Sequence, residues 1–508
     1  MSLLLLVSGC SALSQLAPND TPTPTNTATA TATYTATATW TATRVPSPTA
    51  SPTVTSSATS TPRPEPTLTP SITPFPLSGF VFDNWDVVDV PADIRDGIQN
   101  QMIAYISANR QVSIANIATA QPATGVQTLY FASPTRLRGR IPVLEVNSTT
   151  GLEVFVPRPG NALAFVRTDG DIRSNGLYIL DFASGFSARV LAGDNPLVQR
   201  GYYMAPSWSP DGSRLAMAVA TGYDIDIYLY AADGSGRTNI TEQGSYDMWP
   251  SWSPDGRHIA FVSDRAECPS WIPSEPGFCD ALTEAPPSGG QVYLYDVESS
   301  SVSRLSDVAA SEAPYWINAT LLAFASGDPF DLLHPQRRIW RADISSGDVR
   351  EIRLPDSPTQ ASYLSESWSP DGAAVLAQIA DRENRLVLLG VDSALIGDDE
   401  ALDFPRFSMS AAWSPDSERI AVGGTAGQCP YGVRVRDSRF RSVADAGPPP
   451  TMCDPHYSFD GQFLAFTGVN PRVDGRNDIY VASANGFGAT SLTSDLRGQV
   501  ELIGWVGG

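Results

Sequence analysis

The side chains best suited to catalysis or metal binding are few in this sequence and lie far apart. It contains three histidines, His258, His334 and His456, and no His-rich or Cys-x-x-Cys segment with the spacing of a zinc site. Two carboxylate-rich segments, residues 168–176 and 470–478, offer the oxygen ligands that Ca²⁺ prefers, but neither has the spacing of an EF-hand loop. We interpret both as polar turns and expect neither a metal nor another cofactor.

The sequence also lacks a recognisable nucleophile. There is no Gly-x-Ser-x-Gly segment, the turn that presents the serine of an α/β-hydrolase. His258 lies in a repeated segment at a position that Arg214 and Arg419 hold in other copies, so we expect it to face solvent. These observations predict a protein that is not an enzyme.

Five cysteines divide into one near the N-terminus, Cys10, and four in the C-terminal half, Cys268, Cys279, Cys429 and Cys453. Four cysteines permit three pairings. The pairing between sequence neighbours closes "CPSWIPSEPGFC" and the longer segment 429–453, both of which interrupt a repeat. Disulfides there would restrain long loops, by about 3 kcal/mol each in the chain-entropy model, and an even number of cysteines outside the membrane favours disulfides.

A strand–turn–strand segment recurs along the chain, as in "PSWSPDGRHIAFVS" at residues 250–263. Its aromatic residue returns every 44 to 64 residues, and a third and a fourth apolar run follow each copy. Pro-Asp-Gly is a tight turn whose glycine needs positive φ. The repeat positions are Trp208, Asp211 and Gly212; Trp252, Asp255 and Gly256; Trp316; Trp368, Asp371 and Gly372; Trp413 and Asp416; Tyr457, Asp460 and Gly461; and Trp505.

Four short strands per repeat, with no helical period, predict an all-β fold, a β-propeller of four-stranded antiparallel blades. Both faces of each blade are apolar because it is packed between neighbours, and the tryptophans are expected to fill the space between blades. The pattern resembles the TolB-type propeller repeat, also called the WD40-like or PD40 repeat, over residues 155–508. Residues 101–120 and 501–508 each look like part of one repeat, so joining them would close the ring. Eight blades are favoured, with seven as the alternative; the TolB domain has six.

The N-terminus predicts an export signal and a tether. "LLLLVSGC" resembles the lipobox of bacterial lipoproteins, with Cys10 as the lipidated residue, although the apolar run is short and no basic residue precedes it. Residues 18–76 are almost entirely Thr, Ala, Pro and Ser, which predicts disorder. We therefore expect a signal at 1–10, a disordered stalk at 11–76 and a propeller at 77–508, held outside the cytoplasm on the bacterial cell membrane by the N-terminal lipid alone.

The formal net charge of −21 argues against nucleic acid as a partner, because phosphates would be repelled. The inserts at 265–290, 326–338 and 425–453 break the repeat, and such loops on a rigid scaffold commonly form a recognition face. Their aromatic residues are the candidate binding residues: Trp271, Phe278, Phe330 and Tyr431.

Three functions are compatible with this pattern. The first is a non-catalytic, lipid-anchored envelope protein whose propeller binds another envelope or extracellular protein, as the resemblance to TolB implies. The second is a surface propeller that binds or cleaves carbohydrate through acidic and aromatic side chains at the mouth of its channel. The third is a purely structural envelope protein. A protein-binding scaffold is the favoured interpretation.

Overall fold

The computed structural model describes residues 85–507, except 88, 96–97, 99, 111–124, 137–138, 149–151, 158–159, 168–174, 193–205, 221, 281–288, 328–335, 359–360, 381–383, 400–408, 426–428, 446–449 and 472–474. The chain divides into two compact units, Met1–Thr69 and Pro70–Gly508, and only the second contains described residues. The predicted signal, Cys10 and the stalk lie outside the described residues, as do Phe330, His334 and most of the segment 168–176.

The described strands form eight four-stranded antiparallel groups, which we call blades 1 to 8 in ring order. Blade 1 joins the two ends of the unit: β33 (Gln499–Val506), β2 (Met102–Arg110), β3 (Gly125–Ala132) and β4 (Arg140–Ser148). Blade 2 contains β5 (Glu153–Phe155), β6 (Ala162–Arg167), β7 (Gly176–Asp181) and β8 (Phe186–Ala192). Blade 3 contains β9 (Ser207–Trp208), β10 (Arg214–Ala220), β11 (Ile225–Ala231) and β12 (Arg237–Asn239). Blade 4 contains β13 (Asp247–Trp252), β14 (His258–Ser263), β15 (Gly290–Asp296) and β16 (Ser301–Ala310).

Blades 5 to 8 repeat the arrangement. Blade 5 contains β17 (Tyr315–Trp316), β18 (Leu321–Ser326), β19 (Arg338–Asp343) and β20 (Asp348–Ile352), and blade 6 contains β21 (Ser362–Trp368), β22 (Ala374–Ala380), β23 (Asn384–Gly390) and β24 (Leu395–Asp399). Blade 7 contains β25 (Met409–Trp413), β26 (Arg419–Gly424), β27 (Arg434–Asp437) and β28 (Ser442–Asp445). Blade 8 contains β29 (Cys453–Tyr457), β30 (Phe463–Val469), β31 (Asn477–Ser483) and β32 (Thr490–Ser491). Two elements stand outside the pattern: β1 (Trp85–Val87) pairs with β8, and α1 (Ala92–Arg95) is the only helix among the described residues.

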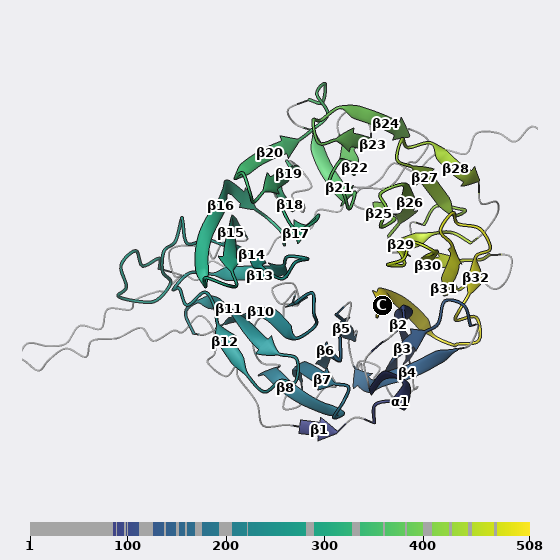
Figure 1. Ribbon diagram of the computed structural model, residues 1–508, viewed down its shortest axis with the longest axis horizontal. Coiled ribbons are helices and arrows are strands. Elements are labelled where there is room, and N and C mark those ends of the chain that lie inside the picture. The colour runs from purple at the N-terminus through teal and green to yellow at the C-terminus, as the bar shows by residue number, and fades with distance from the viewer. Residues whose placement is uncertain are drawn as a thin grey trace, which may run out of the picture. The chain divides into compact units, whose positions relative to one another are not determined.

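The blades stand around a common axis, with the first strand of each blade innermost and the fourth outermost (Figure 1). The predicted closure is confirmed, because β33 pairs antiparallel with β2 from Met102↔Val506 to Ala108↔Gln499. A strand from the C-terminus thus completes a blade whose other strands come from the beginning of the unit. The all-β propeller and the favoured count of eight blades are both observed.

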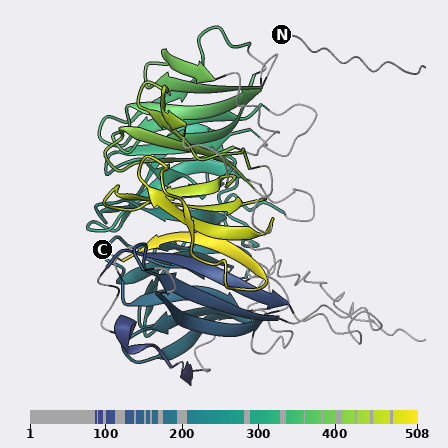
Figure 2. The same ribbon diagram turned by 90° about the vertical axis from the view of Figure 1, so that its right-hand side faces the viewer.

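Alternating strand direction gives the ring two different ends, seen edge-on in Figure 2. The first-to-second and third-to-fourth strand connections lie at one end, which we call the turn face. The second-to-third connections and the links between blades lie at the other, which we call the insert face. Both disulfide-containing inserts belong to the insert face, because they follow β14 and β26, each the second strand of its blade.

Four of the repeated tryptophans join neighbouring blades by hydrogen bonds as well as by packing. The indole Nε1 of Trp208 donates to the carbonyl of Phe155 in the preceding blade at 2.9 Å. Equivalent bonds run from Trp316 to Ser251, from Trp413 to Ser367 and from Trp505 to His456. In each case the acceptor is the residue before the aromatic position of the neighbouring blade. Each such bond satisfies a donor that would otherwise be buried without a partner.

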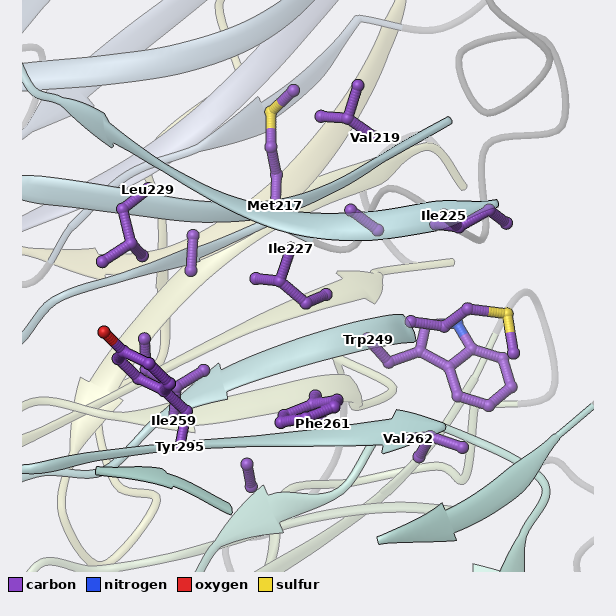
Figure 3. Close-up of a cluster of buried hydrophobic side chains, with 14 of the residues drawn as sticks. Met217, Val219, Ile225, Ile227, Leu229, Trp249, Ile259, Phe261, Val262 and Tyr295 are labelled. Carbon is purple, nitrogen blue, oxygen red and sulfur yellow. The ribbon is translucent and has the colours of Figure 1, made fainter. Parts of the chain in front are cut away.

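Apolar layers between the blades form the core. Figure 3 shows the layer between blades 3 and 4, where Ile227 of one blade points towards Phe261 of the next, whereas Met217 points to the opposite face of its own blade. Alternate residues on a strand point to opposite faces, so a blade packed on both sides needs apolar residues at nearly every position, and β10 and β14 have them. Among the described residues, no helix could span a membrane.

Candidate partner-binding face

The first insert is fastened by the disulfide Cys268–Cys279, which confirms the sequence-local pairing. Its centre is Trp271, which is 3% exposed, stacks on Tyr246 at 4.9 Å and donates its indole N–H to Asp264 Oδ2 at 2.8 Å. The expectation that Trp271 belongs to the binding surface is therefore wrong. The ring of Trp271 joins the apolar core layer of blades 3 and 4 instead.

Phe278 is the residue that this insert presents to solvent. Its side chain is 41% exposed, although it lies next to the buried Cys279. The amide of Cys279 donates to the carbonyl of Ser270 at 2.8 Å, which closes the loop beside the disulfide. The ring of Phe278 is therefore carried on a backbone that is both covalently and hydrogen-bond restrained, so little conformational entropy remains to be lost when it contacts a partner.

The second disulfide, Cys429–Cys453, confirms the other predicted pair and crosses between two blades. Cys429 follows β26 of blade 7, whereas Cys453 begins β29, the innermost strand of blade 8. Backbone pairs reinforce the connection at Gly424↔Cys453 and Tyr431↔Thr451. Tyr431 is 50% exposed on this fastened segment.

Phe278 and Tyr431 share the insert face but not one patch. They belong to the inserts of blades 4 and 7, which blades 5 and 6 separate in the ring. Exposed aromatic rings also occur on the turn face, at Phe186 (45%) and Phe487 (53%), each in a third-to-fourth strand hairpin. A partner that touches both Phe278 and Tyr431 must therefore be a macromolecule that spans several blades.

Beneath the first insert lies a group of buried carboxylates, Asp226, Asp247 and Asp264, exposed by 4%, 0% and 1%. Burial, together with the charge of Asp224, raises the pKa of Asp226 to about 7, against hydrogen bonds from Asn239 and Gln243. Burial and the charge of Asp247 raise the pKa of Asp264 to about 6. Burial also raises the pKa of Asp247, although Arg265 Nη2 lies 2.7 Å from its Oδ2.

A further set of carboxylates lies on the innermost strands and was missed by sequence reasoning. Glu153 of blade 2 and Glu501 of blade 1 are exposed, and Asp454 of blade 8 is half-buried. Burial and the charge of Glu501 raise the pKa of both Glu153 and Asp454. Three blades that meet at the ring closure thus bring three carboxylates within electrostatic range. The sequence signal that could have found them is an acidic residue three or four positions before the repeat position that is usually aromatic.

The two described histidines, His258 and His456, lie in blades 4 and 8 and do not form a site with one another. His258 was expected to face solvent, but its side chain is 22% exposed, its ring stacks on Trp316 of the next blade at 6.3 Å, and its Nε2 lies 3.5 Å from Asp296. His258 occupies the same place that Arg214 holds over Trp252. Burial lowers the pKa of His456. Within the described part of the chain, no group of three His, Cys, Asp or Glu residues is placed to hold a metal ion.

The repeat residues Trp208, Trp252, Trp316, Trp368, Trp413, Tyr457 and Trp505 lie on the innermost strands, and the aspartates that follow them lie in the turns. In each Ser-Pro-Asp turn the serine hydroxyl donates to the aspartate, as from Ser253 to Asp255 at 2.6 Å, and it accepts the amide five positions on. The glycines Gly212, Gly256, Gly372 and Gly461 have φ between 67° and 72°, as a tight turn requires.

Comparison with known proteins agrees with this architecture. Residues 154–271 match the family model described as the TolB beta propeller domain, PD40, so this segment carries TolB-type propeller repeats. None of the curated proteins compared with the chain matches it in sequence.

Solved structures with a similar fold include TolB from Acinetobacter baumannii, with 15% identity, a TM-score of 0.31, and coverage of 70% of this chain and 82% of that one. An oligogalacturonate lyase in complex with manganese has 13% identity and a TM-score of 0.41 over 76% of this chain and 98% of that one. A eukaryotic initiation factor has 13% identity and a TM-score of 0.47 over 79% and 96%. At such identities the similarity concerns the fold.

Proposed function

We propose that this protein is a non-catalytic binding scaffold of the bacterial cell envelope, anchored by a lipid on Cys10, whose propeller engages another envelope or extracellular protein through the insert face. The observation that carries the proposal is the fastening of exposed aromatic rings at that face. Phe278 and Tyr431 are 41% and 50% exposed on loops that the two disulfides restrain. Aromatic side chains held in place by a rigid scaffold are the residues that contribute most at protein interfaces.

The composition of the chain supports the location. Two disulfides fit an oxidising compartment, and "LLLLVSGC" ends in the cysteine that a lipoprotein would acylate. The substitution Cys10→Ser is expected to move the protein from the membrane fraction to the soluble fraction. Mass spectrometry of the N-terminal peptide is expected to find acyl chains on Cys10. An unacylated Cys10 in membrane-bound protein would contradict the anchoring.

Capture of partners from envelope extracts tests the binding face, with matched variants at the two ends of the ring. The variants Phe278→Ser and Tyr431→Ser are expected to abolish capture of a partner that the unaltered protein binds. Phe186→Ser and Phe487→Ser remove similarly exposed rings from the turn face, so they are expected to leave capture unchanged. Equal losses in both pairs would show that the insert face is not the binding face.

A second candidate function, carbohydrate binding or cleavage at the ring axis, is favoured by one observation. Glu153, Asp454 and Glu501 lie on the innermost strands of three neighbouring blades, and burial together with the charge of Glu501 raises the pKa of the first two. Paired carboxylates of this kind can serve as general acid and base. A glycan array followed by product analysis distinguishes the candidates: a bound glycan lost in Glu153→Gln but kept in Phe278→Ser would favour carbohydrate over a protein partner.

A further inference from the structure

The first insert folds back onto the chain that links blades 3 and 4. The backbone amide of Trp271 donates to the carbonyl of Gly244 at 2.6 Å, and the indole ring of Trp271 stacks on Tyr246 at 4.9 Å. Both partners lie between β12 and β13, in residues 243–246, which we call the docking linker. The described part of the insert, residues 265–280, is therefore docked on this linker through Trp271.

Asp264 joins the insert to the docking linker from beneath. One of its oxygens accepts the backbone amide of Tyr246 at 2.7 Å, and the other accepts the indole N–H of Trp271 at 2.8 Å. Its side chain is buried, with the residue 1% exposed. Undocking the insert removes the ring of Trp271 from this carboxyl group, so it lets water reach Asp264.

Asp226 belongs to the same arrangement. Gln243 of the docking linker donates its backbone amide to Asp226 Oδ1 at 3.2 Å, and its side-chain amide donates to the carbonyl of Pro269 in the insert at 3.1 Å. Asn239 Nδ2 donates to the other oxygen of Asp226 at 2.8 Å. One linker residue thus connects this second carboxylate to the insert.

Too little positive charge lies beneath the docked insert to balance its carboxylates. Arg265 pairs with Asp247 at 2.7 Å, and no arginine is paired with Asp226 or Asp264 in the described residues. Three ionised carboxylates and one guanidinium leave two buried negative charges, which is costly. Burial, assisted by the neighbouring negative charges, therefore raises the pKa of Asp264 to about 6 and of Asp226 to about 7.

The other titratable and charged groups around these carboxylates come from every element packed there. They are Asp224 before β11, Tyr228 in β11, Arg237 in β12, Tyr246 in the docking linker, Tyr293 in β15, Arg304 in β16, and Glu267 and Glu275 in the insert. No group of three side chains in the part of the chain that the structure describes is placed to hold a metal ion. Protons are therefore the means of neutralising the carboxylates beneath the insert.

The docked insert holds protons that the undocked insert releases, because an aspartate in water has a pKa near 3.8. Docking is strongest below about pH 3.8 and weakens as the pH rises through about 6 and about 7. We propose that the first insert is a pH-dependent latch, docked in an acidic medium and released as the medium becomes neutral, so that acidity fixes Phe278 in place. This inference rests on the proposed function and describes how the insert face is regulated.

The disulfide of the insert reports undocking in the absence of any partner. Cys268 and Cys279 are 5% and 7% exposed in the docked insert, so a phosphine reductant reaches them faster when the insert is released. The Cys429–Cys453 bridge of the same molecule is the internal control, because pH changes the reactivity of the reductant equally for both bridges. Alkylation of the freed thiols followed by mass spectrometry gives both reduction rates.

Hydration of Asp264 alone shifts the docking equilibrium about tenfold between about pH 5 and about pH 8. The ratio of the two reduction rates, the insert bridge over the control bridge, is therefore expected to rise about tenfold over that range in the full-length protein. Asp264→Asn is expected to keep the ratio within about twofold, because an amide does not ionise. Glu298→Gln, which removes an exposed carboxylate from a hairpin of the same blade, is expected to leave the rise unchanged.

A second variant keeps the test decisive if Asp264→Asn does not fold. Trp271→Phe retains an aromatic ring over Tyr246 but removes the indole donor, so it is expected to raise the ratio about fivefold at about pH 5. A ratio that stays constant or falls with pH would overturn the proposal, as would a full rise in Asp264→Asn. Equal acceleration of both bridges would also overturn it, because the whole ring would then be opening. Since no partner is present, these outcomes are independent of the capture experiment with Phe278→Ser.

Discussion

The pKa values of carboxylates are shifted in opposite directions at the two ends of the ring. On the turn face, burial opposes ionisation of Asp211, Asp255, Asp416 and Asp460, but hydrogen bonds from a serine hydroxyl and a backbone amide prevail and lower the pKa of each. On the insert face, burial prevails and raises the pKa of Asp226 to about 7 and of Asp264 to about 6. Saturated turns recur in blades 3, 4, 7 and 8, whereas the buried carboxylates support one insert, because Asp264 accepts hydrogen bonds from Tyr246 and Trp271 and Asp247 pairs with Arg265.

The largest expected difference between the two faces concerns covalent bonds. Cys429→Ser/Cys453→Ser releases a bridge that spans 24 residues and joins blade 7 to the innermost strand of blade 8. The chain-entropy model gives a loss of about 3 kcal/mol in the free energy of unfolding. Asp416→Ala in blade 7 removes turn hydrogen bonds and is expected to cost about 1 kcal/mol. Denaturant unfolding measures both, and a serine pair that costs no more than Asp416→Ala would contradict the role given to the insert face.

The dependence of stability on pH is expected to differ in sign between the faces. Because the pKa of Asp226 is raised from 3.8 to about 7, its contribution is fully present below about pH 3.8 and is lost as the pH rises through 7. The contribution of Asp255, whose pKa is lowered, is present above pH 3.8 and is lost as the pH falls through its folded value.

Asp226→Asn is therefore expected to flatten the decline of stability between pH 5 and pH 8, by about 2 to 3 kcal/mol over that range. Asp255→Asn changes the level of stability in the same range but not its slope, which makes it the matched control. Urea unfolding at several pH values gives both slopes. A wild-type protein whose stability rises from pH 5 to pH 8 would show that the buried carboxylates of the insert face do not dominate this range.

The repeat could be predicted from sequence because its causes are local. Trp252, Asp255 and Gly256 act within one hairpin and its nearest neighbour, so the blade, the turn and the ring closure at Trp505 followed from the pattern. Both disulfides followed from loop proximity.

The candidate site could be predicted only in part, because its geometry is not local. Trp271 lies in an insert that interrupts the repeat, which predicts an exposed side chain, but in the structure its ring stacks on Tyr246. Glu153, Asp454 and Glu501 become neighbours only when the ring closes. Glu366 likewise meets its charged partner, Arg337, only when blades 5 and 6 pack together.

The smallest expected effect tests the turn face at the one Ser-Pro-Asp turn that lacks glycine. Blade 7 has Ser417 where the other Ser-Pro-Asp turns have glycine, and its φ is 61°, in the left-handed region that costs a non-glycine residue about 1 kcal/mol. Its hydroxyl accepts the backbone amide of Asp371 in blade 6 at 3.1 Å, an exposed bond worth about 0.5 kcal/mol. Ser417→Gly relieves the strain and loses the bond, so we expect a gain of about 0.5 kcal/mol. Ser417→Ala keeps the strain and loses the bond, so we expect a loss of about 0.5 kcal/mol. If thermal unfolding finds Ser417→Gly less stable than the unaltered protein, the inter-blade bond contributes more than the strain of the turn.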